Sequence, residues 1–283
     1  LEQIDVGADL SVRYSYVDAF GMIETVTSSA LGPVENVNDL PQGMLRIDGI
    51  GDQYQTLTLD PAAIMDTDGI EDGSQAITWL RNGQAIEGAV GQSYTLTQAD
   101  VAAQITARYT YTDQFGTVER IDADLSGPVR NINDGPTGEI VIDGTPQEGA
   151  TLIADISGIG DLDGIDPGTV SLQWLRDGLV IDGAEGAAYL LDQGDVGAQL
   201  SVLYRYSDLF GAPEQKQSAA TGPIQNTNDA PRGQLLILGE PVENNTLRVV
   251  TSGIEDADGI DAATVAVQWL RDGVEIAGAN GVE

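Results

Sequence analysis

The stretch Val170-Ser-Leu-Gln-Trp-Leu-Arg-Asp-Gly178, followed by Leu179-Val-Ile-Asp-Gly183, decides the fold. Its alternating side chains predict a strand with every second residue directed inward, and Arg176-Asp-Gly178 predicts a tight turn into the next strand. The tryptophan of this stretch recurs every 95 residues, as Trp79, Trp174 and Trp269. A fixed period of domain length indicates one unit copied in tandem.

The copy that spans residues 131–225 shows the pattern of one unit most clearly. Besides the stretch quoted, strands are predicted at 138–142, 150–156, 189–191 and 199–206. About seven short strands with frequent turns are typical of an antiparallel sandwich. The tryptophan in mid-strand and the turn Asp195-Val-Gly197 resemble the immunoglobulin-like sandwich. We therefore expect an all-β chain, a linear array of 95-residue antiparallel Ig-like sandwiches, with the recurring tryptophans in their cores.

The phase of the repeat divides the chain into four parts. Leu1-Glu-Gln-Ile-Asp5-Val aligns with Leu96-Thr-Gln-Ala-Asp100-Val, which lies deep inside a repeat, and Glu283 aligns with Ala188. Residues 1–34 are thus the C-terminal half of a repeat, 35–130 and 131–225 are complete repeats, and 226–283 are the N-terminal half of another. We expect that neither half closes a core alone, that the chain is a window on a longer polypeptide, and that the halves of two molecules can associate head to tail.

Composition restricts the function. The formal charge is −33, from 45 acidic and 12 basic residues, which disfavours nucleic acid and anionic lipid and favours divalent cations. An acidic surface suited to a salty habitat is an alternative origin of the bulk charge. Cysteine and histidine are both absent, so disulfides, thiol chemistry, histidine-dependent catalysis and the usual zinc ligands are excluded from this segment. No apolar run is long enough for a membrane helix.

Two acidic motifs recur in register in every copy. Each junction carries Asn-x-Asn-Asp-x-Pro, and each following unit carries Asp-x-Asp-Gly-Ile between its second and third strands. In an Ig-like topology this loop, the loop between strands F and G and the incoming linker meet at one end of the domain. The candidate ligands are Asn36, Asn38, Asp39, Asp66, Asp68 and Asp113 at the first junction, Asn131, Asn133, Asp134, Asp161, Asp163 and Asp208 at the second, and Asn226, Asn228, Asp229, Asp256 and Asp258 at the third.

Four or more converging carboxylates repel one another unless a cation lies among them. Their number and hard oxygen atoms suit Ca2+, which takes six to eight such ligands, better than Mg2+. The alternative is ordinary turn chemistry, to which Asn-Asp-Pro and Asp-x-Asp-Gly are both suited. Recurrence of both motifs at a fixed mutual spacing favours calcium.

The turn between the first two strands of the preceding unit is expected to add one more ligand. Glu148 and Glu243 occupy this position in register, and Gln53 replaces them in the first complete repeat. The junction at Asn131 to Asp134 is therefore expected to bind calcium more weakly than the junction at Asn226 to Asp229.

The linker motif, the Asp-x-Asp-Gly loop and the upstream glutamate are similar to the inter-domain calcium sites of cadherins. The strings Trp174-Leu-Arg-Asp-Gly178 and Tyr111-Thr-Asp-Gln-Phe-Gly116 resemble cadherin-like or Ig-like tandem repeats of giant bacterial surface and secreted proteins. The resemblance implies calcium-rigidified extender domains exported by type I secretion. One departure is that Asn stands where cadherin linkers carry an additional Asp. An EF-hand is excluded because Ile64, Ile159 and Ile254 occupy the place of its first acid.

These observations predict structural, calcium-rigidified extender repeats of an extracellular or cell-surface bacterial adhesin or filament, and not an enzyme, because every candidate carboxylate pair recurs from copy to copy. The alternatives are the non-catalytic repeat region of a large secreted enzyme, or a module that binds carbohydrate or protein. A binding module calls for an exposed aromatic platform, whereas most in-register aromatic residues fall on inferred core faces and Tyr54 is an exception. Arg81, Arg176 and Arg271 are expected to be structural charge partners at a turn.

Overall fold

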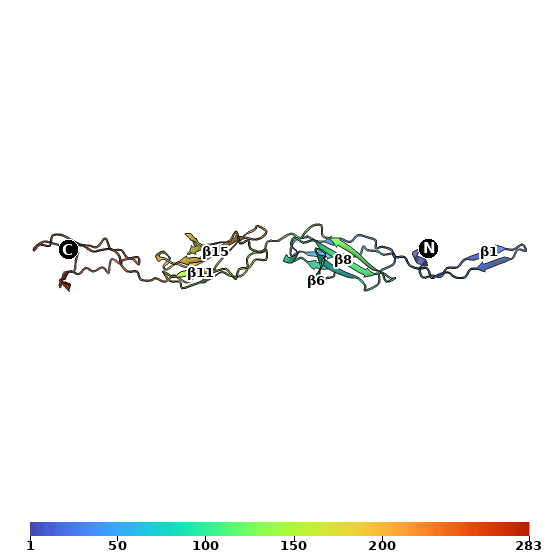
Figure 1. The fold of residues 1–283 in the computed structure, drawn as a ribbon, viewed down its shortest axis with the longest axis horizontal. Helices are drawn as coiled ribbons and strands as arrows, with labels where there is room; N and C mark the ends of the chain where they lie inside the picture. Colours follow the sequence, from blue (N-terminus) through green and yellow to red (C-terminus); the bar gives the residue numbers. More distant parts are fainter. Residues whose placement is uncertain (283) are drawn as a thin grey trace. The chain divides into compact units, whose positions relative to one another are not determined.

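The computed structural model describes residues 1–282, and the chain divides into two compact units, Leu1–Asn133 and Asp134–Glu283. Each unit contains one closed β-sandwich and one half-repeat (Figure 1). The closed sandwiches correspond to the two complete repeats expected from the 95-residue period.

The sandwich of the first unit consists of two antiparallel sheets. One has the order β3-β4-β7 and the other the order β6-β5-β8-β9. The strands are β3 (Ile47–Asp48), β4 (Thr56–Leu59), β5 (Ala76–Arg81), β6 (Gln84–Val90), β7 (Ser93–Thr95), β8 (Ile105–Thr112) and β9 (Val118–Asp124), and the 3-10 helix η2 (Gln98–Asp100) connects β7 to β8.

The sandwich of the second unit repeats this topology, with sheets β10-β11-β14 and β13-β12-β15-β16. Its strands are β10 (Val141–Asp143), β11 (Thr151–Asp155), β12 (Ser171–Arg176), β13 (Leu179–Glu185), β14 (Ala188–Leu190), β15 (Leu200–Ser207) and β16 (Pro213–Gln217), with η3 (Gln193–Asp195) before β15. The seven strands and the all-β, Ig-like sandwich confirm the expected fold class. The strand predicted at 138–142 is shorter and later than expected.

The hairpin that carries the tryptophan is built by its turn residues. Asn82 and Asp177 both have φ of +48°, and the glycines that follow them, Gly83 and Gly178, have φ of about +80°. Positive φ at both central positions defines the turn that matches the twist of paired strands, and Asn-Gly and Asp-Gly are the residues that tolerate it. The turn residues thereby direct β5 back into β6 and β12 back into β13.

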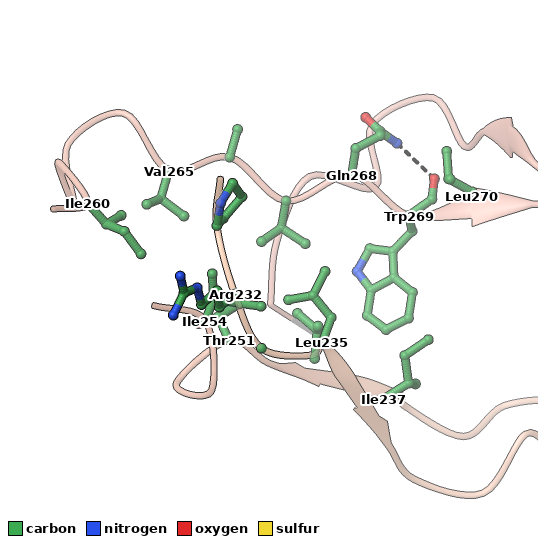
Figure 2. Close-up of a pocket in the computed structure, with 15 residues that line it drawn as sticks. Arg232, Leu235, Ile237, Thr251, Ile254, Ile260, Val265, Gln268, Trp269 and Leu270 are labelled. Carbon is green, nitrogen blue, oxygen red and sulfur yellow. Dashed lines mark hydrogen bonds between the residues drawn. The ribbon is translucent and has the colours of Figure 1, made fainter. Parts of the chain in front are cut away.

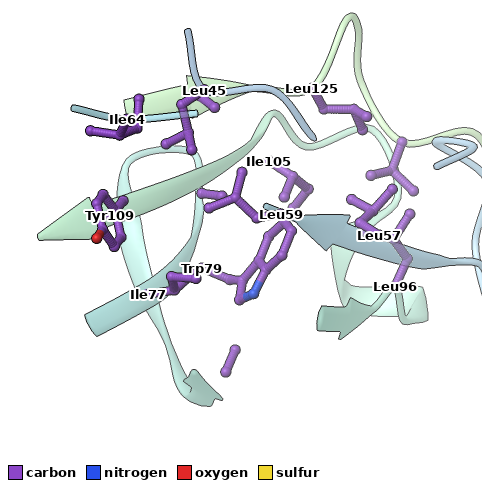
Figure 3. Packing of buried hydrophobic residues seen from close by; sticks show 14 of the residues in the cluster. Leu45, Leu57, Leu59, Ile64, Ile77, Trp79, Leu96, Ile105, Tyr109 and Leu125 are labelled. Carbon is purple, nitrogen blue, oxygen red and sulfur yellow. The ribbon is translucent and has the colours of Figure 1, made fainter. Parts of the chain in front are cut away.

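The tryptophans of the complete repeats lie in the sandwich cores. Trp79 and Trp174 are both fully buried, and each indole donates a 3.0 Å hydrogen bond to a backbone carbonyl, of Gly91 or Gly186. Figure 3 shows Trp79 among Leu57 and Leu59 of strand β4 in the facing sheet and Ile105 of the neighbouring strand β8. Burying the indole while satisfying its N–H gives each core a large apolar contribution without an orphaned donor.

Strand β8 shows why the alternating pattern selects a sandwich. Ile105, Ala107, Tyr109 and Tyr111 are buried on one face, and the residues between them are half-buried on the other. Strand β15 places Leu200, Val202, Tyr204 and Tyr206 in the same way. Period-two burial is the signature of a strand that packs one face on a core.

The half-repeats contain fewer strands. Residues 1–34 form the 3-10 helix η1 (Gln3–Asp5) and the hairpin β1 (Arg13–Val17) and β2 (Ile23–Thr27), in which every strand residue is exposed. The other half-repeat holds the pairs β17 (Leu236–Leu238) with β18 (Arg248–Val250), and β19 (Leu270–Arg271) with β20 (Val274–Glu275). Trp269 is only half-buried there (Figure 2), because the half-repeat lacks the strands that cover the tryptophan in the complete repeats.

Candidate metal centres at the repeat junctions

The fold brings together the loops that were expected to share one end of each sandwich. Ile70, just after the Asp-x-Asp-Gly loop, pairs with Asp113 in an isolated antiparallel bridge. In the second unit the backbone N–H of Leu209 donates to the carbonyl of Asp163 at 3.4 Å. Each F–G loop, which connects β8 to β9 or β15 to β16, therefore lies beside the Asp-x-Asp-Gly loop of the same sandwich.

The first junction lies within the first unit and connects residues of both its repeats. The carboxylate of Asp68 accepts from the backbone N–H of Asp39 at 2.6 Å and from the Gln3 side-chain amide at 2.8 Å. The Asp68 backbone N–H in turn donates to Asp66 at 2.9 Å, and Gln3 also donates to Asn36 at 3.3 Å. The linker, the acidic loop and the preceding half-repeat are thus joined through Asp68, which is almost completely buried.

Glu119 is a junction residue that the motif analysis missed. It is 8% exposed, and its carboxylate accepts a 2.8 Å hydrogen bond from the side chain of Asn38. Gln3 was missed as well. Both recur in register, as Glu24, Glu119 and Glu214 and as Gln3, Gln98 and Gln193, so their recurrence at the 95-residue period was the available signal.

Each F–G loop carries a buried carboxylate oxygen that accepts no hydrogen bond. Asp113 and Asp208 are 1% and 2% exposed. In both, one oxygen accepts two 2.8 Å bonds from backbone amides, whereas the buried Oδ2 has no hydrogen-bond partner in residues 1–282. Burial would raise the pKa of Asp113, but the amides of Thr117 and Phe115 hold it below its ordinary value, so this carboxylate is ionised at neutral pH.

The second unit begins with a linker aspartate bound to its acidic loop in the same way. The backbone N–H of Asp134 donates to the Asp163 carboxylate at 2.6 Å, and the Asp163 N–H donates to Asp161 at 2.8 Å. The Tyr206 hydroxyl donates to the second oxygen of Asp161. In the first unit, Tyr111 donates to Asp66 at 2.5 Å. Burial, then the hydrogen bond to aspartate, raises the pKa of both tyrosines, so each remains a donor.

At the end of the first unit, Gln53 performs a structural role. It is fully buried, its side-chain amide donates to Gln98 at 2.5 Å, and its side-chain oxygen accepts from the backbone N–H of Ile132 at 3.1 Å. The side-chain oxygen of Asn131 is buried without a hydrogen-bond partner in the described residues. The neutral Gln53 therefore holds the linker backbone in place but adds no charge.

The third junction, in the second unit, brings three carboxylates together. One oxygen each of Glu148, Asp229 and Asp258 lies within 4.8 Å of the others. The backbone N–H of Asp229 donates to Asp258 at 2.8 Å, and that of Thr227 donates to Glu148 at 3.2 Å. The amide of Gln193, in the orientation that satisfies both its atoms, donates to Glu148 at 3.0 Å. The upstream glutamate, the linker and the acidic loop therefore meet as the sequence predicted.

The other predicted ligands lie around these groups. Asp256 accepts from the Asp258 backbone N–H at 3.0 Å, and Asn228 donates to the Asp229 carbonyl at 3.0 Å. Asn226 is exposed, and Asn133 has an interaction partner within the described residues. Glu243 is exposed and belongs to no three-acid cluster among residues 1–282.

The recurring arginines support the sandwiches and contribute nothing to the junctions. Arg81 and Arg176 form 2.7 Å ion pairs with Asp100 and Asp195, whose side chains are fully buried. Each aspartate also completes the capping box of its 3-10 helix, because its carboxylate accepts from the backbone N–H of the N-cap residue, Thr97 or Asp192. Arg271 has no ion pair within the described part of the chain. The expected charge pairing is thus seen in the two complete repeats.

The exposed aromatic residues of the complete repeats are few. Tyr54 is 47% exposed, as the sequence analysis anticipated, and Phe115 and Phe210 at the F–G turns are 49% and 53% exposed. The sequence analysis expected most in-register aromatic residues on core faces, and these phenylalanines are in-register residues that lie outside them.

Comparison with known proteins yields structural neighbours only. No family model matches the sequence, and no curated protein matches it. A Ca2+-stabilized adhesin of an Antarctic bacterium that binds ice is 12% identical, with 81% of this chain and 59% of that chain covered and a TM-score of 0.30. A 1.5-MDa bacterial ice-binding adhesin is 14% identical, with 71% of this chain and 70% of that chain covered and a TM-score of 0.26. The tandem Ig repeats of Dlar are 14% identical, with 66% of this chain and 98% of that chain covered and a TM-score of 0.21.

This chain thus spans less than two thirds of the length of the Antarctic adhesin structure. No helix within residues 1–282 is long and apolar enough to cross a membrane.

Proposed function

We propose that this segment is a structural array of Ig-like repeats whose junctions bind Ca2+ and are stiffened by it, in an extracellular or cell-surface bacterial protein of the adhesin or filament type. The observation that carries the proposal is the buried, unpartnered Oδ2 atom of Asp113 and of Asp208. A buried carboxylate oxygen in that position is costly unless a cation or a hydrogen-bond donor meets it.

The donor set fits calcium. All groups at these junctions are carboxylate and amide oxygens, which Ca2+ prefers, and the absence of histidine and cysteine removes the nitrogen and sulfur ligands of softer metals. Asp39, Asp66, Asp68 and Asp113 would hold the ion at the first junction with Asn36, Asn38 and Glu119. Glu148, Asp229 and Asp258 would hold it at the third. Bound calcium would supply positive charge that joins linker, loop and preceding repeat.

The mechanical consequence follows from chain connectivity. Without the ion, a linker between two sandwiches keeps its backbone freedom and its carboxylates repel one another. Ligands drawn from two repeats and their linker restrict that freedom when one ion binds them all. We propose that extension, and not catalysis, is the role of this segment, since every junction carboxylate recurs in register.

Terbium luminescence tests the site assignment. Tb3+ takes the same oxygen ligands as Ca2+, and Tyr111 and Tyr206 donate to Asp66 and Asp161, close enough to transfer excitation energy. Excitation of tyrosine is expected to produce terbium emission. Excess Ca2+ should abolish this emission, whereas excess Mg2+ should not change it. Asp113→Asn should weaken the emission, whereas the matched change Asp122→Asn, on strand β9 away from the junction, should not. Emission that both variants retain in full would refute the assignment of Asp113.

A further inference from the structure

The chain leaves its two complete repeats by the same backbone path. In the first, the Gln53 N–H donates to the Arg130 carbonyl at 3.0 Å, and in the second the Glu148 N–H donates to the Gln225 carbonyl at 2.9 Å. In each repeat an isolated parallel bridge joins the turn between the first two strands to the same linker residue. A difference in how the two linkers are held therefore comes from side chains.

One linker amide in each repeat donates to a side chain of that turn. The Ile132 N–H donates to the side-chain oxygen of Gln53 at 3.1 Å. The Thr227 N–H, which is in register with it, donates to the carboxylate of Glu148 at 3.2 Å. The same hydrogen bond thus ends on a neutral amide in one linker and on an acid in the other.

The side chain of Gln53 is satisfied by the protein itself. It is fully buried, and while its oxygen accepts from Ile132, its nitrogen donates to the side-chain oxygen of Gln98 at 2.5 Å. Gln98 is the first residue of η2, so this contact joins the linker to two segments of the first complete repeat. A buried neutral group with partners for both its polar atoms keeps its hydrogen bonds without an ion.

The turn at Gln53 also carries an acid, Asp52, which the chain neutralises. The Nε atom of Arg130 lies 2.5 Å from the Asp52 carboxylate. Arg130 is largely exposed, so this ion pair adds little stability, but it leaves the turn and the start of its linker formally neutral. Gln147 and Gln225 stand at the same two positions of the second complete repeat, where the acid is Glu148 instead.

Glu148 has acidic neighbours where Gln53 has a neutral one. One oxygen each of Glu148, Asp229 and Asp258 lies within 4.8 Å of the others. Without a cation, the two aspartates repel the carboxylate that accepts from Thr227, and Asp229 belongs to the linker that this carboxylate holds. A bound ion turns the repulsion into attraction. The hydrogen bond to Thr227 is therefore coupled to the ion.

We propose that Gln53 locks the linker at residues 130–132 to the first complete repeat independently of calcium, whereas Glu148 holds Thr227 to the second complete repeat only while the ion is bound. Falling calcium then loosens the linker of the third junction at its start and leaves that of the second attached. Calcium concentration thereby selects which linkers of the array loosen. The contrast rests on the proposed calcium site at the third junction, whereas the lock at Gln53 does not.

Amide hydrogen exchange of the full chain, read by NMR in excess Ca2+ and in chelator, tests the lock. The Ile132 amide should exchange equally slowly in both solutions. The Thr227 amide should exchange ~30-fold faster in chelator, the factor that corresponds to two charge repulsions at the spacing of the cluster. The Leu125 amide, which donates to the Ile105 carbonyl in the first sandwich, should stay slow in both and reports that this sandwich is folded.

Exchanging the two side chains supplies matched variants. Glu148→Gln should make the protection of Thr227 independent of calcium, and Gln53→Glu should make the protection of Ile132 depend on it. Gln53→Met removes the acceptor and should speed exchange of the Ile132 amide in both solutions. The Leu125 amide shows whether each Gln53 variant keeps its sandwich, so a failure to fold is distinguished from a lost lock.

The outcomes separate this inference from the proposed function. Fast exchange of Ile132 in chelator, or the same calcium dependence for both amides, would overturn the lock and leave the calcium proposal standing. Constant protection of Thr227 would overturn the contrast between the linkers together with the assignment of Glu148 as a calcium ligand. The lock at Gln53 would then still be supported by constant protection of Ile132.

Discussion

Replacing Glu148 by glutamine removes one negative charge from the third junction and tests whether that charge contributes to calcium binding. The change keeps the shape of the side chain and reproduces the residue that the first complete repeat carries at the same position, Gln53. Its effect is expected to reverse sign between calcium-free and calcium-containing solution, because Glu148 repels Asp229 and Asp258 but attracts the ion.

The structure sets the size of both effects. Unit charges separated by the 4.8 Å that bounds this cluster repel by about 1 kcal/mol even at the dielectric constant of water. Removing one charge of three relieves two such pairs, so in chelator Glu148→Gln should stabilise the junction by about 2 kcal/mol. A carboxylate about 2.4 Å from Ca2+ is worth about 3 kcal/mol on the same basis, so one binding step should weaken ~100-fold.

Calorimetric titration with Ca2+ measures this loss, and the chain offers its own control. Glu243→Gln is the identical change at the register-equivalent position, and Glu243 is exposed and belongs to no three-acid cluster in the described residues. It should leave every binding step unchanged. Equal effects of the two variants, or no effect of Glu148→Gln, would refute the reasoning.

Three further predictions follow from the same structure. Gln53→Glu should strengthen calcium binding by the chain in titration, and unchanged binding would count against a ligand at this position. Arg81→Met should destabilise its sandwich by about 3 kcal/mol in chemical denaturation, because it leaves the buried Asp100 without its ion-pair partner. Arg120→Met removes a more exposed ion pair and should cost less than ~1 kcal/mol. Equal losses of stability in the two variants would contradict the burial argument. Arg108 and Arg120 lower the pKa of Asp122 to about 2. The stability that the Asp122 carboxylate adds is therefore complete above pH ~4 and lost as pH falls toward 2. If Asp122→Asn loses the same stability in an acid titration of unfolding, Asp122 is not the source of that loss.

Much of the fold could be predicted because each unit carries strong local signals. The Asn-Gly and Asp-Gly turns after Arg81 and Arg176 fix a hairpin, and alternation along 199–206 fixes the buried face of β15. The short strand β10 was harder to place, since its residues are exposed or half-buried and only three of them pair. Trp269 shows that a motif reports the face to which a residue belongs, whereas burial also requires the strands that cover that face.

The candidate sites, like the fold, could be predicted from the sequence only in part. The recurring Asp-x-Asp-Gly and Asn-x-Asn-Asp-x-Pro motifs identified the acids that meet at Asp68 and at Asp258, because loops at one end of a sandwich converge by topology. Glu119 and Gln3 were missed because neither belongs to a motif with known metal chemistry, and only tertiary contacts bring them to the linker. The unpartnered Oδ2 atoms of Asp113 and Asp208 are likewise visible only in three dimensions.

The thermal unfolding temperature in excess Ca2+ and in chelator tests the central claim most directly. A ligand at a hundred times its dissociation constant stabilises the folded state by about 2.7 kcal/mol, and 1 kcal/mol shifts the midpoint of a domain of this size by ~4–8 °C. The account therefore predicts a rise of roughly 10–20 °C in calcium and a much smaller rise in Mg2+. The same unfolding temperature in calcium and in chelator would contradict it, and would leave the recurring acids as turn and surface chemistry.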